Sequence, residues 1–324
     1  MKRLLHPVRW YLPRVALALL IIITAGAVLL YLRFRQDVRA AEERIAGGSR
    51  IADTPCGVIE YADQGGEGRV VLVSHGAGGG YDQGLAVSEQ LGAGFRIIAP
   101  SRFGYLNTPY PDDPSAAAQA DAHACLLDSL GVEKVLVIAF SAGGPSALQF
   151  ALRHPDRTDA LIMVSAISDG SLVDPRPVDP SKDPALSTML HDFPFWMAVT
   201  YFPDDVLRFF GMTPEAQRRL TPEEHDRAVR VVRMILPMGM RATGNFNDPA
   251  HWFERGDFKL ENIRAPTLVV HARDDTFVAF AHAQYTAQHI PNARLASFDY
   301  GGHFVIVRDA VAAEIASFIG QIGK

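Results

Sequence analysis

Residues 134–145 read KVLVIAFSAGGP, an apolar run that breaks abruptly at a serine set among small residues. Six consecutive apolar residues bounded in this way predict a buried strand, and the alanine-rich stretch that follows predicts a helix. A strand that turns this sharply into a helix exposes one hydroxyl, that of Ser141, at the tip of the turn. The rest of the chain must decide whether this serine is a nucleophile or an ordinary turn residue.

Short apolar stretches alternate with amphipathic ones on both sides of this segment. Such alternation predicts a mostly parallel, doubly wound α/β sheet covered by helices on both faces. The expected strands are 58–62, 70–74, 95–99, 135–140, 160–164, 267–271 and 294–298. The expected helices are 115–130, 145–153, 279–289 and 308–319.

The alternation stops between residues 168 and 255, where no strand pattern appears. Thr221 and Glu224 have the spacing of a capping box with proline between them, which predicts a helix start. We therefore expect a helical cap at 168–255, inserted between strands 6 and 7 of a core formed by 49–167 and 256–324. The cap is rich in methionine and aromatic residues, which favours either a small core of its own or a lid that offers apolar surface to a substrate.

Residues 15–32, VALALLIIITAGAVLLYL, contain no charge and are long enough to cross a bilayer core as a helix. A cleaved signal peptide is the rival interpretation, because Ala25 and Ala27 are small, but the apolar run continues beyond them. We predict a single-pass membrane anchor at 1–34 and a connector at 35–48. Arginine and lysine are balanced on the two sides of the span, so the positive-inside rule gives no orientation. We favour an extracytoplasmic location for the large domain.

Composition excludes several classes of function. The net charge of −5 is spread along the chain and does not suggest a nucleic-acid partner. The two cysteines, Cys56 and Cys125, stand far apart and in no CxxC spacing, so no disulfide framework is predicted, and a link between the two is an alternative without support in the sequence. Cys125 is expected to pack as a small hydrophobe. His282 and His289 fall on an expected surface helix without partnering ligands, and neither a metal nor an organic cofactor is predicted.

Three further segments follow predicted strands. Residues 75–80, HGAGGG, lack the GK[ST] of a phosphate loop and the spacing of a dinucleotide motif, but fit an oxyanion hole built from backbone N–H groups. Residues 271–278, HARDDTFV, offer two adjacent aspartates, Asp274 and Asp275. Residues 300–304, YGGHF, place His303 between glycines and a phenylalanine in a loop. A serine, an aspartate and a histidine in this order, each at a strand end, predict nucleophilic catalysis.

At this point the sequence resembles the α/β-hydrolase superfamily, particularly members with a helical cap, over residues 49 to the C-terminus. The resemblance implies that Ser141 is the nucleophile and His303 the base. The acid is then Asp275, three residues before a valine, with Asp274 as the fallback and Asp169 as another alternative. The resemblance also implies an oxyanion hole made by two backbone N–H groups, those of Ala77 and Ala142.

Two departures from the family pattern involve no reacting group. Ala139 replaces a glycine in the turn, and Ala279 stands where the acid motif usually has proline. A serine at position 141 argues against the dehalogenases and epoxide hydrolases of this fold, which use aspartate there.

The mechanism we expect is two-step acyl transfer, without a cofactor, on a small-molecule ester that carries a hydrophobic group. A C–C bond hydrolase, an amidase or an aminopeptidase has the same fold and stays an alternative. A non-catalytic, membrane-anchored binder of a hydrophobic ligand is the contrasting class.

Overall fold

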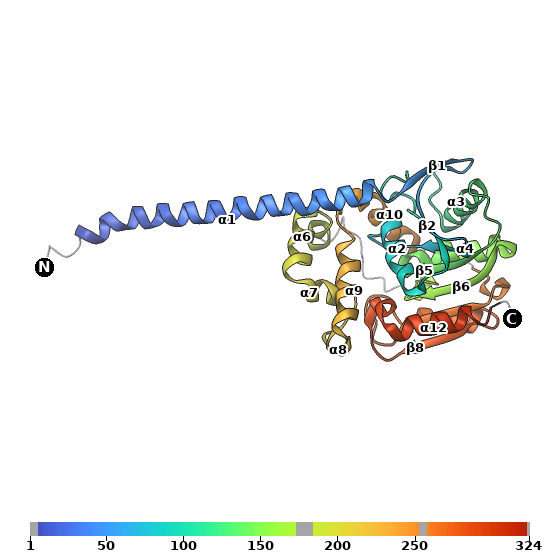
Figure 1. Ribbon diagram of the computed structural model, residues 1–324. Coiled ribbons are helices and arrows are strands. Elements are labelled where there is room, and N and C mark those ends of the chain that lie inside the picture. Colours follow the sequence, from blue (N-terminus) through green and yellow to red (C-terminus); the bar gives the residue numbers. More distant parts are fainter. Residues whose placement is uncertain (1–5, 173–183, 253–257, 323–324) are drawn as a thin grey trace. The chain divides into compact units, whose positions relative to one another are not determined.

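A computed structural model describes residues 6–172, 184–252 and 258–322 of the chain (Figure 1). The chain divides into two compact units, Met1–Arg44 and Ile45–Lys324. The boundary between them falls inside the expected connector at 35–48.

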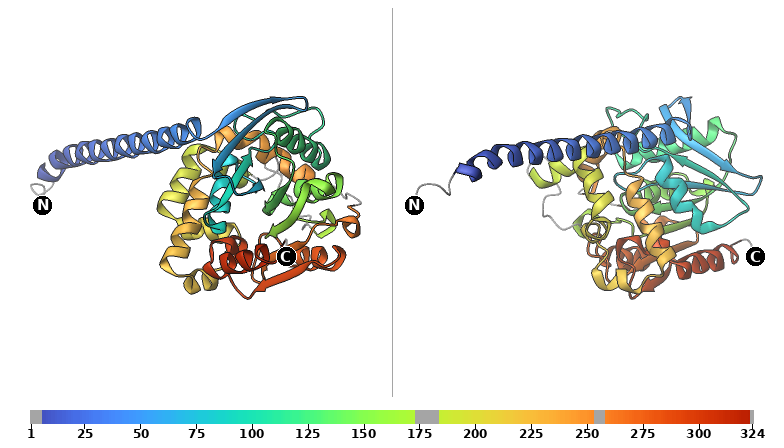
Figure 2. Two further views of the ribbon diagram at one scale, coloured as in Figure 1. Left: turned by 45° about the vertical axis from the view of Figure 1, so that its right-hand side comes forward. Right: turned by 60° about the vertical axis from the view of Figure 1, so that its left-hand side comes forward.

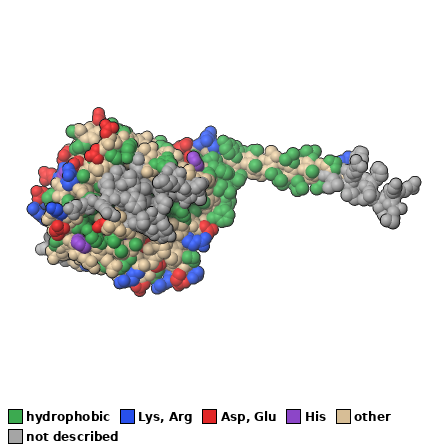
Figure 3. Space-filling model, turned by 180° about the vertical axis from the view of Figure 1, so that it is seen from behind, with side chains coloured by type: hydrophobic (Ala, Val, Ile, Leu, Met, Phe, Trp, Pro, Cys, Tyr) green, Lys and Arg blue, Asp and Glu red, His purple; other side chains and the backbone are tan. Residues whose placement is uncertain are grey.

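The first unit consists of one long helix, α1 (His6–Ala46). Over 13–46 it is long and apolar enough to cross a membrane, a property that a signal sequence shares. Between Val15 and Leu32 most of its large apolar side chains are exposed, among them Leu20, Ile22, Ile23 and Leu29, and apolar side chains line the face seen in Figure 3. An exposed helical stretch that is apolar on all sides is typical of a membrane-spanning segment.

The second unit is built on an eight-stranded sheet in the order β1-β2-β4-β3-β5-β6-β7-β8. The pairs β1–β2 and β2–β4 are antiparallel and all other pairs are parallel. The strands are β1 (Arg50–Thr54), β2 (Gly57–Gly65), β3 (Arg69–Ser74), β4 (Phe95–Pro100), β5 (Val135–Phe140), β6 (Thr158–Val164), β7 (Thr267–Ala272) and β8 (Arg294–Phe298). The predicted doubly wound sheet is confirmed. Only β1 was not predicted, because this edge strand is short and mostly exposed and so lacks an apolar run.

Helices cover both faces of the sheet (Figures 1 and 2), as its continuous apolar strands require. On one face α3 and α4 lie side by side, and α2 and α12 pack on the other. Every residue of β5, the central strand that leads to Ser141, is buried. The helices of the core are α2 (Tyr81–Ser88), α3 (Ala116–Ser129), α4 (Gly144–Arg153), α11 (Ala281–His289) and α12 (Asp309–Ile319).

Between β6 and β7 the described chain forms only helices, as predicted. They are α5 (Pro184–Met189), α6 (Asp192–Tyr201), α7 (Pro203–Phe209), α8 (Pro214–Arg219), α9 (Pro222–Arg233) and α10 (Ala242–Trp252). The capping box of Thr221 and Glu224 begins α9. Trp196 and Met212 are fully buried while Phe202 and Phe209 are exposed, so the helical segment has both packed and exposed apolar side chains. The ends expected at 168 and 255 cannot both be compared, since 173–183 and 253–257 lie outside the described residues.

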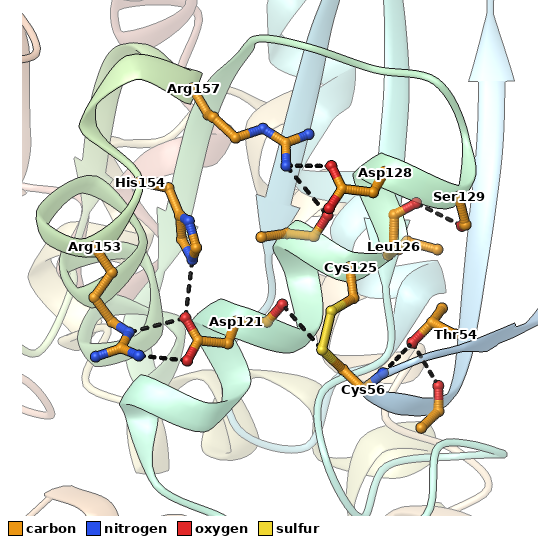
Figure 4. Close-up of a disulfide and its surroundings, with 12 residues drawn as sticks. Thr54, Cys56, Asp121, Cys125, Leu126, Asp128, Ser129, Arg153, His154 and Arg157 are labelled. Atoms are coloured by element: carbon orange, nitrogen blue, oxygen red, sulfur yellow. Dashed lines mark hydrogen bonds and ion pairs between the residues drawn. A yellow bond between two sulfur atoms is a disulfide. The ribbon is translucent and has the colours of Figure 1, made fainter.

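One expectation about the cysteines is wrong. Cys56, in the turn between β1 and β2, forms a disulfide with Cys125 of α3, with 6.0 Å between the Cα atoms (Figure 4). Cys125 is therefore not a free apolar side chain. No local pattern points to the bond, because the two cysteines are 69 residues apart and meet only once the β1–β2 turn lies against α3.

Candidate active site

Ser141 lies at the turn between β5 and α4, in a short 3-10 turn, Ser141–Gly143. Its φ of +52° is a left-handed conformation that few residues other than glycine adopt. A Cβ added to Gly143 would lie 2.2 Å from the carbonyl oxygen of Ser74. A Cβ added to Gly144 would lie 2.0 Å from that of Ile167. The carbonyl groups of Ser74 and Ile167 thus leave room only for glycine at positions 143 and 144. Ala139, by contrast, fits within the sheet, where it pairs with Ser74.

His303 joins Ser141 to Asp275. Its Nε2 is 2.9 Å from Ser141 Oγ, and its Nδ1 is 2.9 Å from Asp275 Oδ2. Because a carboxylate only accepts, Nδ1 carries the proton and Nε2 is free to accept the serine hydroxyl proton. All three side chains are buried. This geometry can transfer a proton from the serine to the imidazole.

The carboxylate of Asp275 is held on all sides. Its Oδ1 accepts the N–H groups of Phe277 at 2.8 Å and Val278 at 2.9 Å, and His271 Nε2 lies 3.2 Å from Oδ2. Burial alone raises the pKa of this carboxyl, but the charge of His303 and the hydrogen bonds from His271 and His303 outweigh burial and lower the pKa below its ordinary value. Asp275 therefore stays ionised. The sequence analysis missed His271, whose only signal was its place at the end of a strand.

The other two candidate acids lie elsewhere. Asp274 accepts the N–H of Gly302 at 2.9 Å, and burial raises its pKa. Asp169 accepts the N–H of Ser171 at 2.6 Å. In the described part of the chain neither carboxylate bonds to His303.

The expectation of a surface position is wrong for His282. This side chain is only 2% exposed, and its Nδ1 accepts the N–H of Ser168. Burial lowers its pKa to about 4. His289 lies on the exposed side of the same helix. Within the described residues no cluster of histidine, cysteine and carboxylate side chains could hold a metal ion.

The two expected oxyanion donors lie in segments near Ser141. A Cβ added to Gly76 would be 3.0 Å from Ser141 Cβ, so the loop after β3 runs close to the Ser141 side chain. Ala77, in this loop, packs against a small apolar cluster that contains Ala142. Ala142 is the second residue of the 3-10 turn, where a helix leaves its first N–H groups without an internal acceptor.

Aromatic rings surround His303. The ring centroids of Phe140 and Phe277 are 5.2 and 5.1 Å from that of the imidazole. Phe210, from the segment between β6 and β7, contacts Phe277 and Phe304 with centroids 5.6 and 6.1 Å away. This shell keeps water from the imidazole and strengthens its electrostatic contacts. A hollow lies beside the turn at Ser141. Its lining includes Ala142, Pro145, Ser146, Arg102 and Tyr110.

This fold is one that many hydrolases share, and Ser141, His303 and Asp275 lie together in it. Residues 69–310 match the family described as alpha/beta hydrolase fold. Because this match spans most of the chain, the protein belongs to the alpha/beta-hydrolase family, and the resemblance seen in the sequence is confirmed.

Three relatives show what this chain is similar to in sequence or in structure. The chain is 27% identical to the uncharacterized hydrolase YcgS of Bacillus subtilis, over 77% of this chain and 89% of that one. It is 28% identical to a 2-hydroxy-6-oxo-6-phenylhexa-2,4-dienoate hydrolase of Burkholderia cepacia, over 75% and 84%. An alpha/beta hydrolase fold protein from Nakamurella multipartita superposes with a TM-score of 0.71 at 28% identity, covering 84% of this chain and 98% of that one. Further relatives at 27–28% identity carry the names of putative carbamate hydrolases and a methyl ester esterase.

Proposed function

We propose that the protein is a serine hydrolase with Ser141 as nucleophile, His303 as base and Asp275 as acid. The observation that supports this most is the chain of two 2.9 Å contacts from Ser141 Oγ through the imidazole to Asp275. Family membership agrees with it.

In the first step His303 Nε2 takes the proton of Ser141 as its oxygen attacks the carbonyl carbon of the substrate. Asp275 keeps the imidazole in the required tautomer and stabilises the imidazolium that forms. The N–H groups of Ala77 and Ala142 bind the developing oxyanion. The imidazolium then protonates the leaving group, and water releases the acyl group by the same steps with His303 again as base.

A fluorophosphonate probe tests this assignment with the full chain in detergent. We expect one adduct per chain on Ser141, located by peptide mass spectrometry, and no adduct in His303→Ala. Ser141→Ala and His303→Ala should both lose ester hydrolysis while staying folded by circular dichroism. Substantial turnover in either variant would contradict the assignment. Ligand binding without turnover in the unaltered protein would favour the binding-protein alternative.

For the substrate we propose a carboxylic ester with a hydrophobic group. The aromatic shell around His303 and the exposed Phe202 and Phe209 of the proposed cap, 168–255, supply apolar surface. In a series of p-nitrophenyl esters, kcat/KM should rise from acetate to medium-chain acyl groups. The alternative is C–C bond hydrolysis, which similarity to the Burkholderia enzyme favours. Turnover of 2-hydroxy-6-oxo-6-phenylhexa-2,4-dienoate above that of every ester would select it.

We further propose that α1 anchors the protein in a membrane, with the catalytic unit outside the cytoplasm. The uninterrupted apolar surface of α1 supports anchoring, and the Cys56–Cys125 disulfide supports an oxidising compartment. Alkaline carbonate should leave the full chain in the membrane fraction. Protease added outside intact cells should digest the catalytic unit; digestion only after permeabilisation would place it inside.

A further inference from the structure

Three backbone N–H groups of the loop after β3, residues 75–80, are held by hydrogen bonds. The N–H of Gly76 donates to Gln83 Oε1 at 2.8 Å, and that of Gly79 to Gly76 O at 3.2 Å. The N–H of Gly78 donates to Asn245 Oδ1 at 2.7 Å. Ala77 lies between them, and its N–H has no acceptor among the described residues. The N–H of Ala77 is thus a donor left over between two fixed neighbours.

Two of the groups that hold this loop come from the segment between β6 and β7. Asn245, in α10, takes the N–H that follows Ala77. Arg241, just before α10, is fully buried and donates a hydrogen bond from Nη1 to the carbonyl oxygen of Gly79 at 2.5 Å. The same guanidinium pairs with Asp82 of α2 at 2.7 Å, so it is itself fixed.

α10 is also bound to the core through a buried ion pair. Arg102 forms two hydrogen bonds of 2.7 and 2.8 Å with Asp248, three residues after Asn245. Arg102 also holds His75 at the start of the loop, through its backbone N–H to His75 Nε2 and its side-chain Nε to His75 O. Both ends of the loop therefore belong to one network with α10.

We infer that Asn245, supported by Arg241, is a positioning residue that fixes the N–H of Ala77 for the oxyanion. The inference rests on the serine hydrolase function proposed above. Gly78, Gly79 and Gly80 give this loop unusual conformational freedom. Without Asn245 the Gly78 N–H loses its acceptor, and the peptide beside Ala77 can rotate. Transition-state stabilisation would then fall, whereas substrate binding would not.

The test compares Asn245→Leu, which has nearly the shape of asparagine but cannot accept a hydrogen bond, with the unaltered full chain. Removing a whole oxyanion donor costs about 10²–10³-fold in kcat, so misplacing one should cost about 10- to 100-fold. KM for a p-nitrophenyl ester should stay unchanged, and fluorophosphonate labelling of Ser141 should slow together with kcat.

A matched control and a second variant complete the test. Thr221→Ala removes the N-terminal cap of α9 without touching the loop and should keep full kcat. Arg241→Lys keeps the charge beside Asp82 but not the forked contacts, and should lower kcat as Asn245→Leu does. Unchanged kcat in both folded variants, or an equal loss in Thr221→Ala, overturns the inference. The proposed function is tested separately, and it fails if Ser141→Ala or His303→Ala retains substantial turnover.

Discussion

Asp274 and Asp275 are neighbours in sequence, but they hold two different parts of the segment that carries the His303 imidazole. Asp275 Oδ2 lies 2.9 Å from His303 Nδ1, and Asp274 Oδ1 accepts the backbone N–H of Gly302 at 2.9 Å. One carboxylate orients the ring and the other orients the loop from which the ring projects.

This division predicts unequal effects of substitution. Asp275→Asn should lower kcat about 10³- to 10⁴-fold, because an amide facing Nδ1 favours the wrong tautomer. Asp274→Asn keeps an oxygen that can accept from Gly302, so its kcat should change little. Asp274→Ala should lower kcat about tenfold, since the backbone N–H of Gly302 loses the side chain that accepts its hydrogen bond. Steady-state ester kinetics measure all three, and the reverse ranking would move the acid to position 274.

Gly211 should be sensitive to substitution, although it lies outside the turn at Ser141. Its φ is +82°, and an added Cβ would lie 2.6 Å from the backbone nitrogen of Phe277 and 3.0 Å from Asp275 Oδ1. Gly211→Ala should therefore displace the loop that contains Asp275 and Phe277 and lower kcat at least tenfold. It should also destabilise the fold by about 1–2 kcal/mol through its positive φ.

The control is Gly131→Ala, whose φ is +64° but whose added Cβ would meet nothing within 4 Å. It should show a similar loss of stability in urea unfolding with unchanged kcat. An equal loss of activity in both variants would mean that backbone strain alone, and not contact with Asp275, is responsible.

Buried histidines should make the fold sensitive to acid. Burial lowers the pKa of His123 to about 3 and that of His282 to about 4, and it takes the pKa of His75 well below its ordinary value. Each is neutral in the folded state but takes up a proton near pH 6.5 in the unfolded state. Protonation therefore favours the unfolded state below pH 6.5 and has no such effect above it. Stability should fall as the pH decreases from 6.5 towards 4, by about 1.4 kcal/mol per pH unit for each histidine.

Urea unfolding at about pH 7 and pH 5 measures this loss. His123→Gln keeps an acceptor for Gln119 and removes one titrating group, so its loss between the two pH values should be smaller by about 2 kcal/mol. The same pH dependence in variant and unaltered protein would exclude His123 as a cause.

The Cys56–Cys125 disulfide should stabilise the catalytic unit without taking part in the reaction. It closes a loop of 69 residues, for which the chain-entropy estimate is about 4 kcal/mol. The double variant Cys56→Ser/Cys125→Ser should unfold at a lower temperature and keep its activity at 25 °C. Reductant should lower the Tm of the unaltered protein only. An effect of reductant on the double variant would point to another cause.

The sequence by itself determined the sheet, the sharp turn at Ser141 and the chain order of a serine, an aspartate and a histidine at strand ends. These features depend on local patterns, namely buried apolar runs and turns that admit only small residues, and such patterns are readable along the chain. It could not choose between Asp274 and Asp275, because adjacent residues share every local signal and differ only in what each side chain meets.

Only the tertiary structure decided how distant segments meet. Cys56 reaches Cys125 across 69 residues, and Asn245 reaches Gly78 across 167 residues. Cys56, Cys125 and Asn245 belong to no motif, and their partners are set by how the sheet packs against α3 and α10. The reacting groups follow from the sequence; the residues that hold them in place follow from packing.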